Sequence, residues 1–360
     1  VILEQQALLL NGSHLRQIVI SDPSFPLAGD PSAFANLPPP SVVRLARHIR
    51  TPYAIQASLS VERKLGRQSY LSAEYTMLRG LKLYRMRDVN APLPATGLRA
   101  DRDFLNIDQF ETSGSSHSHS FSLGFRTAVR GRLQLISQYT LSHATDDTSG
   151  PFSLPADNFN LRAERGRADF DQRHCFTLAS VLKLPRGFGL ALIASVRSGI
   201  PFNITTGFDN NHDTVFNDRP SLGNPQAPFT SFGVEGSFVG GTPGVLYDGA
   251  RALSGGGLVS VNANNVHWLI LPGAGNVGRN TGEGPGFANL DLRFAKKFIL
   301  WKGQNKSEAS RDVELRLDAF NLLNHVNFKN YVGTLSSPFF GLANDALPAR
   351  ELQVSARLRF

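Results

Sequence analysis

The sequence predicts an all-β fold, and more narrowly an antiparallel, up-and-down transmembrane β-barrel. Three observations lead to this prediction. Several segments alternate strictly between apolar and polar residues, and short turns alternate with long connections along the chain. No run of about eighteen apolar residues occurs, which excludes a transmembrane helix but not strands that cross a membrane.

The alternation is clearest in the closing segment "ELQVSARLRF", in which every second residue is apolar. Successive side chains of a strand point to opposite faces, so this strand has one apolar face and one polar face. The same pattern recurs in "IQASLSVE", "SFSLGFRTAV", "ANLDLRF" and "DVELRLDAF". Strands of this kind separate two solvents, which we predict to be lipid outside the wall and a wet, polar interior.

We expect about eleven strands of a larger barrel, and the first two alternate poorly. In chain order the expected strands cover residues 1–10, 13–20, 53–65, 69–80, 117–129, 132–143, 172–184, 188–206, 286–299, 312–323 and 351–360. Most reach the length of about 9–11 residues that a tilted strand needs to cross a bilayer.

The connections fall into two alternating classes. Short turns are expected at residues 11–12, 66–68, 130–131, 185–187 and 300–311, and long loops at 21–52, 81–116, 144–171, 207–285 and 324–350. Because strands of a meander reverse direction each time, all short turns lie at one end. Outer-membrane barrels have short periplasmic turns and long extracellular loops. We therefore expect residues 1–360 to form a single, incomplete barrel domain, with "FLNIDQFE" (104–111) inside the second long loop as a strand projecting beyond the membrane.

Composition excludes several classes of function. The net charge is +8, but the basic residues are scattered without a cluster or stacking aromatics, so we expect no nucleic-acid partner. The single cysteine, Cys175, cannot form an internal disulfide. The chain has no HExxH, GxSxG, P-loop or helix-opening GxGxxG motif, and we expect no enzymatic activity.

Seven segments together carry a resemblance to a known family. They are "TPYAIQASLSVERKL", "RDVNAPLP", "YTLSHATDD", "SGIPFNITTGFDNNHDTVFNDRP", "VGRNTGEGPGFANLDLRFAKKF", "RLDAFNLLNHVNF" and the closing "LRF". In this order they resemble the C-terminal barrel part of TonB-dependent receptors, in particular the Oar-like group with a carboxypeptidase-regulatory-like domain. The resemblance implies a receptor in the bacterial outer membrane that binds an extracellular ligand and imports it.

The same resemblance implies partners and missing parts. The expected partners are outer-membrane lipid and lipopolysaccharide, the outer-membrane assembly machinery through the terminal Phe360, and the TonB complex through an N-terminal region. In this family a plug domain, a TonB-contacting box and earlier strands would precede Val1. Bacterial single-chain barrels have an even number of strands, so we expect a fragment carrying about half of a barrel of about twenty-two strands.

Two other classes of protein remain open at this point. The first is a structural or adhesive outer-membrane barrel without transport, and the second is a secreted soluble β-protein. A plug and TonB box encoded upstream favour transport. A soluble protein would show no continuous apolar belt on its surface.

One loop has the spacing of a cation site. In "DNNHDTVFND", Asp209, Asn211 and Asp213 fall at positions one, three and five of a Ca²⁺-binding loop, and Asn217 and Asp218 follow as further oxygen donors. Thr214 replaces the usual turn glycine, and no glutamate closes the loop at position twelve. The alternative is a surface turn rich in Asn and Asp. Both interpretations stay open, and apart from Ca²⁺ at this loop we expect no cofactor.

Two further groups of side chains have less specific patterns. His117 and His119 share one strand face, as two ligands of a transition metal would, but no third ligand is evident. Five arginines lie on polar strand faces, where they either line an aqueous path or form cross-strand charge pairs that fix register. They are Arg126, Arg293, Arg316, Arg357 and Arg359.

Overall fold

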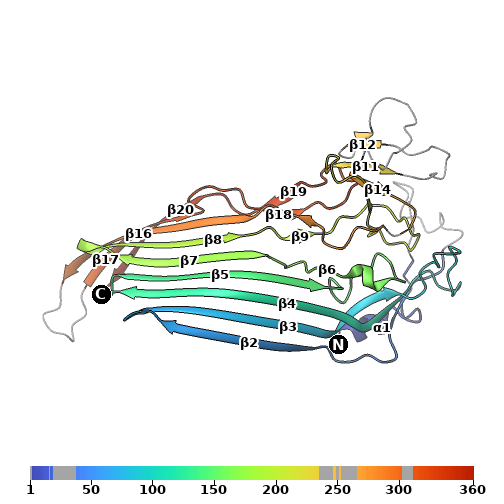
Figure 1. Ribbon diagram of the computed structural model, residues 1–360, viewed down its shortest axis with the longest axis horizontal. Coiled ribbons are helices and arrows are strands. Elements are labelled where there is room, and N and C mark those ends of the chain that lie inside the picture. The colour runs from blue at the N-terminus through green and yellow to red at the C-terminus, as the bar shows by residue number, and fades with distance from the viewer. Residues whose placement is uncertain are drawn as a thin grey trace.

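The chain forms a long antiparallel wall whose strands lie side by side in chain order (Figure 1). The computed structural model describes residues 2–15, 17–18, 38–234, 246–248, 251–252, 266–273, 275–301 and 311–360. The strands of the wall are β2 (Tyr53–Lys64), β3 (Ser69–Asp88), β4 (Ile107–Val129), β5 (Leu133–Asp146), β7 (His174–Lys183), β8 (Phe188–Arg197), β16 (Phe287–Trp301), β17 (Arg311–Phe320) and β20 (Glu351–Arg359). The predicted all-β, antiparallel class is confirmed.

Two short strands pair with the wall from its side. β1 (Val42–Leu45) runs parallel to β4, and β6 (Gly166–Arg167) runs antiparallel to β5. The described residues include the 3-10 turns η2 (Leu161–Glu164), in a connection, and η3 (Pro185–Gly187), at the turn from β7 to β8. Among the described residues, no helix has the length and apolar character needed to cross a membrane.

The first two predicted strands are wrong. Residues Ile2–Leu9 form the helix α1, because "ILEQQALL" consists largely of strong helix formers without alternation. Of the second predicted strand, residues 13–15 lie outside any strand and Gln17 makes only an isolated bridge to Ser41. Val1 and residues 16, 19 and 20 lie outside the described residues.

Several strands also differ from the prediction at the end that lies next to the long connections. β3 continues to Asp88 and β4 begins at Ile107, so both extend into the segment 81–116 that was predicted as a loop. "FLNIDQFE" thus contributes to β4 itself, where it pairs with β3 and β1. By contrast, β8 ends at Arg197, and the short β9 (Pro201–Phe202) leaves the wall to pair with β15 (Gly282–Glu283).

The two faces of the wall have opposite chemistry, as the alternation predicts. Register aligns Leu59, Tyr75, Phe121 and Leu141 in one row across β2 to β5, and the neighbouring row on the other face is polar. Leu59 is 70% exposed and Leu352 is 64% exposed, and Leu123 and Leu315 are exposed as well. These leucines would form a dry interior in a soluble protein. Here they form the lipid-facing surface.

The polar face carries the charge pairs proposed for the strand arginines. Arg293 pairs with Asp318 directly across from it on β17, at 2.5 Å between Nε and Oδ1. Arg126 reaches Glu62 at 2.9 Å between Nη2 and Oε1. Arg126 and Arg293 thus form the cross-strand pairs of the second alternative and stabilise register at the inner face. Arg316 instead pairs with Glu314 of its own strand at 2.6 Å.

The two ends of the wall differ, as Figure 1 shows. Short turns and the C-terminus lie at one end. Small sheets and connections lie at the other end, built from β10 (Ser221–Leu222), β11 (Ser231–Val234), β12 (Leu246–Asp248), β13 (Arg251–Ala252) and β14 (Trp268–Ile270), and from β18 (Phe328–Tyr331) paired with β19 (Ala343–Ala346). This is the segregation that outer-membrane barrels show.

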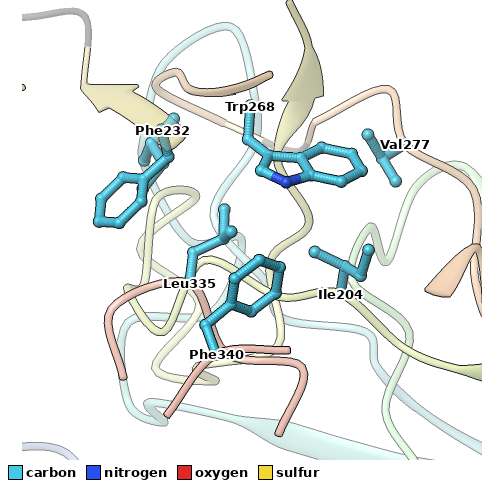
Figure 2. Close-up of a cluster of buried hydrophobic side chains, with 7 residues drawn as sticks. Ile204, Phe232, Trp268, Val277, Leu335 and Phe340 are labelled. Atoms are coloured by element: carbon cyan, nitrogen blue, oxygen red, sulfur yellow. The ribbon is translucent and has the colours of Figure 1, made fainter. Parts of the chain in front are cut away.

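A dry core lies among these connections rather than in the wall (Figure 2). The buried cluster consists of Ile204, Phe232, Trp268, Ile270, Val277, Leu335 and Phe340. Its residues come from two connections, one between β8 and β16 and one between β17 and β20. The indole of Trp268 also donates a hydrogen bond from Nε1 to the carbonyl of Phe229 at 2.7 Å. The two connections therefore fold against each other as one unit.

Candidate functional site

The candidate site lies in the connections at the loop end of the wall. We call the described residues of 89–106, 147–173, 198–286 and 321–350 the loop layer. Its interior holds many buried polar groups, unlike a simple set of solvated loops. Buried charges are retained when they are paired and hydrogen-bonded, so the layer has an organised interior.

The first feature is a group of three arginines that we call the arginine cluster: Arg219 and Arg279 of the layer, and Arg85 of β3 beside it. Each is at most 5% exposed. Arg219 binds both carboxylate oxygens of Glu164, at 2.6 Å and 3.1 Å. A bidentate pair of this kind combines charge with fixed geometry. Because Glu164 belongs to the β5–β7 connection and Arg219 to the β8–β16 connection, the pair joins the two.

The other two arginines join further parts of the chain. Arg85, near the end of β3, lies 2.6 Å from Asp147. Arg279 pairs with Asp146 and with Asp169, and its Nε donates to the carbonyl of Glu164 at 3.0 Å. Burial and, to a lesser extent, the like charge of Arg85 lower the pKa of Arg279 to about 10. The guanidinium nevertheless remains charged at neutral pH.

A cavity of about 380 Å³ opens beside this cluster. Its polar lining includes Arg85, Asp147, Glu164, Asn217, Arg219 and Arg279. The volume lies in the range of small-molecule sites. Each arginine is already paired with a carboxylate, so the cluster first of all fixes the connections that form the cavity wall.

The loop predicted to bind Ca²⁺ forms the second feature. Asp209 accepts hydrogen bonds from the backbone N–H of Asp213 at 3.0 Å and of Thr214 at 2.9 Å. Asn211 Oδ1 accepts from the same Asp213 N–H at 3.0 Å. Thr214 has φ 74°, so the turn forms without the glycine that a Ca²⁺ loop usually places there. The structure thus brings the first three predicted residues together.

The last two predicted residues lie differently. Asp218 is fully buried and accepts from the backbone N–H of Asn210 at 2.6 Å through Oδ2, whereas its Oδ1 has no partner among the described residues. Asn217 turns away and donates to the carbonyl of Leu154 at 2.9 Å. Burial raises the pKa of Asp218 to about 7 and that of Asp213 to about 6. The carboxylates of this loop therefore have too little positive charge nearby to compensate for their burial.

Metal binding at this loop stays a prediction. In the part of the chain that the structure describes, no group of three or more His, Cys, Asp and Glu residues is arranged to hold a metal ion. Most carboxylate oxygens of the loop already accept backbone hydrogen bonds. A Ca²⁺ ion would therefore need amide and carbonyl oxygens in addition to the carboxylates.

We expect calorimetric titration of Ca²⁺ into the protein to show binding that Asp213→Ala abolishes, because this residue lies at the centre of the cluster. Asp103→Ala, an exposed aspartate of the same layer, serves as the matched control and should bind as the wild type does. Absence of heat in all three proteins would exclude the Ca²⁺ site. The loop would then be a hydrogen-bonded turn only.

A second cavity, of about 410 Å³, lies next to this loop. Asn211, His212 and Asp213 line one side, and Leu93, Pro94 and Phe159 contribute apolar surface. Apolar walls with a few polar groups are typical of ligand pockets. The two cavities make the loop layer, rather than the wall, the place where a small ligand fits.

The predicted histidine pair lies elsewhere. His117 and His119 are on the lipid-facing side of β4, continuing the row of Phe121, Leu123 and Phe125 toward the loop end. Arg85, Arg219 and Arg279 were not predicted from the sequence to be site residues. The available signal was the "NDRP" segment, in which Arg219 directly follows two of the predicted ligand residues.

Fold and site together define a wall of a bacterial outer-membrane β-barrel with an organised extracellular loop layer. A family model described as outer membrane beta barrel domain matches residues 10–353. The chain belongs to this family, and the protein is located in the bacterial outer membrane. No curated protein matches the sequence.

Three solved structures are similar in fold at low sequence identity. The outer membrane transporter YddB from Escherichia coli has 12% identity and a TM-score of 0.49, with 89% of this chain and 34% of that chain covered. The ferric-catecholate import receptor Fiu from E. coli K12 has 12% identity and a TM-score of 0.42, covering 86% and 28%. The FrpB iron transporter from Neisseria meningitidis has 11% identity and a TM-score of 0.43, covering 88% and 32%. The chain thus spans about a third of the length of these structures.

Proposed function

We propose that the chain is the C-terminal part of a TonB-dependent receptor barrel, in which it forms part of the wall and binds an imported ligand in its loop layer. The observation that carries this proposal is the open wall. Among the described strands, β2 and β20 are each hydrogen-bonded to one neighbour only and do not pair with each other. A strand edge without partners is not tolerated in hydrocarbon, and we therefore propose that further strands close the barrel.

The size of the closed barrel supports the receptor class. Barrels with about eight strands are filled by side chains, whereas those with about twenty-two strands enclose a plugged lumen. The wall here already contributes nine strands and remains open. A plug and a TonB-contacting segment belong, in this proposal, to a region N-terminal to the wall. The seven quoted segments favour the Oar-like group within this class.

The organised loop layer supports ligand binding within this proposal. Buried arginine–carboxylate pairs hold the connections in place, and two cavities open between them. A site that is formed in advance loses less conformational entropy when the ligand binds. Among the described residues the site offers binding groups, and we propose a non-enzymatic role.

A second candidate function is adhesion without transport. It is favoured by large apolar side chains exposed on the loop layer, which are Phe159, Phe170, Phe216 and Phe339. Exposed apolar patches mark surfaces that bind other macromolecules. The dry core of Figure 2 would hold such a surface rigid.

Binding to the periplasmic domain of TonB separates the two functions without knowledge of the ligand. For a receptor, we expect this domain to co-purify with the complete protein in detergent, and removal of the TonB-contacting segment to abolish the interaction. A protein that is found in the outer membrane but does not bind TonB would contradict transport. Adhesion of intact cells to protein-coated surfaces would then test the second function.

A further inference from the structure

Cationic and histidine side chains gather on the lipid-facing side of the wall, close to its loop end. Register places Arg79 opposite His117 and His119 opposite His143. We call the following residues of β3, β4, β5 and β7, together with Arg173 directly before β7, the interface patch: Tyr75, Arg79, His117, His119, Tyr139, His143, Arg173 and His174. These positions lie on four neighbouring segments, although they are far apart in sequence.

The patch lies at the level where the apolar band ends. On β4, His119 lies ten positions before Val129, which is at the turn end. At about 3.4 Å per residue and a tilt of about 40°, this corresponds to about 26 Å of membrane depth. The apolar band of outer-membrane barrels is about 25 Å tall. His119 and its neighbours therefore lie at the height of the outer lipid headgroups.

Two tyrosine–histidine pairs give the patch a repeated geometry. Tyr75 Oη lies 2.8 Å from Nδ1 of His119, and Tyr139 Oη lies 2.8 Å from Nδ1 of His174. Both pairs are stacked at 6.2 Å between ring centroids. Each hydrogen bond holds the imidazole through Nδ1, which leaves Nε2 as the atom that can bind a ligand.

The two arginines supply charge that is not used by nearby carboxylates. Asp171 is bound by Arg167 at 2.8 Å, and Asp147 is bound by Arg85. Within the described part of the chain, neither Arg79 nor Arg173 forms an ion pair, and both side chains are exposed. Arg173 approaches His143 instead, at 3.4 Å between Nη2 and Nδ1. The same Nδ1 lies 3.5 Å from Oδ2 of Asp171, so among the patch histidines it is His143 that has a carboxylate neighbour in the described part of the chain.

The patch is confined to one part of the wall. On the same face, the next strands β8 and β16 place Val196 and Ala288 beside Phe176, without a charged residue. A girdle of interfacial residues would continue around the barrel. A local group of arginines and histidines at headgroup level instead matches the pattern by which proteins bind anionic lipid headgroups.

We propose that the interface patch is a binding site for the phosphate groups of the outer-leaflet glycolipid. Arg79 and Arg173 provide the positive charge, and the histidine Nε2 atoms provide hydrogen bonds. Guanidinium groups suit phosphate because their planar donors match its oxygens. The site depends on the location in the outer membrane and not on transport, so it remains valid if the proposed receptor function fails.

The test compares two charge-matched double variants of the complete barrel in zwitterionic detergent. Bis-phosphorylated lipid A is the probe, and the bound fraction is measured by native mass spectrometry. We expect Arg79→Gln/Arg173→Gln to weaken binding at least about tenfold. The control Arg63→Gln/Lys296→Gln removes two lipid-facing charges at the turn end and should stay within about twofold of the wild type.

Further controls test whether each variant is folded and whether binding depends on charge and on phosphate. Heat-modifiable electrophoretic mobility verifies that each variant is folded, and Arg79→Lys/Arg173→Lys should retain most of the binding because it keeps the charge. Lipid A without phosphates should bind weakly to every variant. Equal losses in the two Gln double variants, or none in Arg79→Gln/Arg173→Gln, would overturn the site.

Discussion

Leu123→Arg is expected to destabilise the folded barrel by about 2–4 kcal/mol, the cost of an arginine on the lipid face near the bilayer midplane. Leu123 lies on β4 between Phe121 and Phe125, in the middle of the lipid-facing rows. The guanidinium would have to reach an interface or draw water into the hydrocarbon. Denaturant unfolding in lipid vesicles measures the loss, and the fraction of heat-modifiable protein in the outer membrane should fall with it.

Ser122→Arg is the matched control, one residue away on the opposite face. Register places Ser122 next to Glu74 of β3, so the new arginine would face a carboxylate and water. We expect a change within about 0.5 kcal/mol, as for a typical surface substitution. Equal destabilisation by the two arginines would contradict the assignment of lipid to the face of Leu123.

The wall could be predicted from the sequence because its signal is local and repeated. A slip of one residue would turn every side chain of a strand to the wrong solvent, so alternation specifies both faces. This is why the row from Leu59 to Leu141 follows directly from the pattern. The prediction failed at α1, where alternation was weak and helix-forming residues dominated.

The candidate site could be predicted only in part. The "DNNHD" spacing indicated that Asp209, Asn211 and Asp213 lie together, because short loops bring such residues into contact whatever the surrounding fold. The arginine cluster carries no such local signal. Arg219 and Glu164 are 55 residues apart, and Arg279 and Asp146 are 133 apart. Their contacts depend on how the connections pack, which no periodicity encodes.

Glu164→Ala is expected to open the loop layer while leaving the wall folded. The substitution leaves the Arg219 guanidinium buried without its bidentate partner, and removing one member of a buried pair costs about 3–5 kcal/mol. This loss of stability affects the contact between the two connections that carry these residues. Limited proteolysis should cut within 147–173 and 204–222 at much lower protease concentration, whereas heat-modifiable mobility of the barrel should persist.

The double variant Glu164→Met/Arg219→Met separates pairing from packing. It removes both charges and keeps apolar volume, and such replacements of buried pairs are often neutral or stabilising. We therefore expect its loop layer to resist proteolysis better than that of either single variant, a non-additivity that reports direct coupling. If the double variant is as sensitive as the sum of the two singles, the pair does not hold the layer together. The cavity beside Arg219 would then be formed by packing alone. In that case the buried apolar cluster that contains Trp268 and Leu335 would maintain the shape of the ligand site.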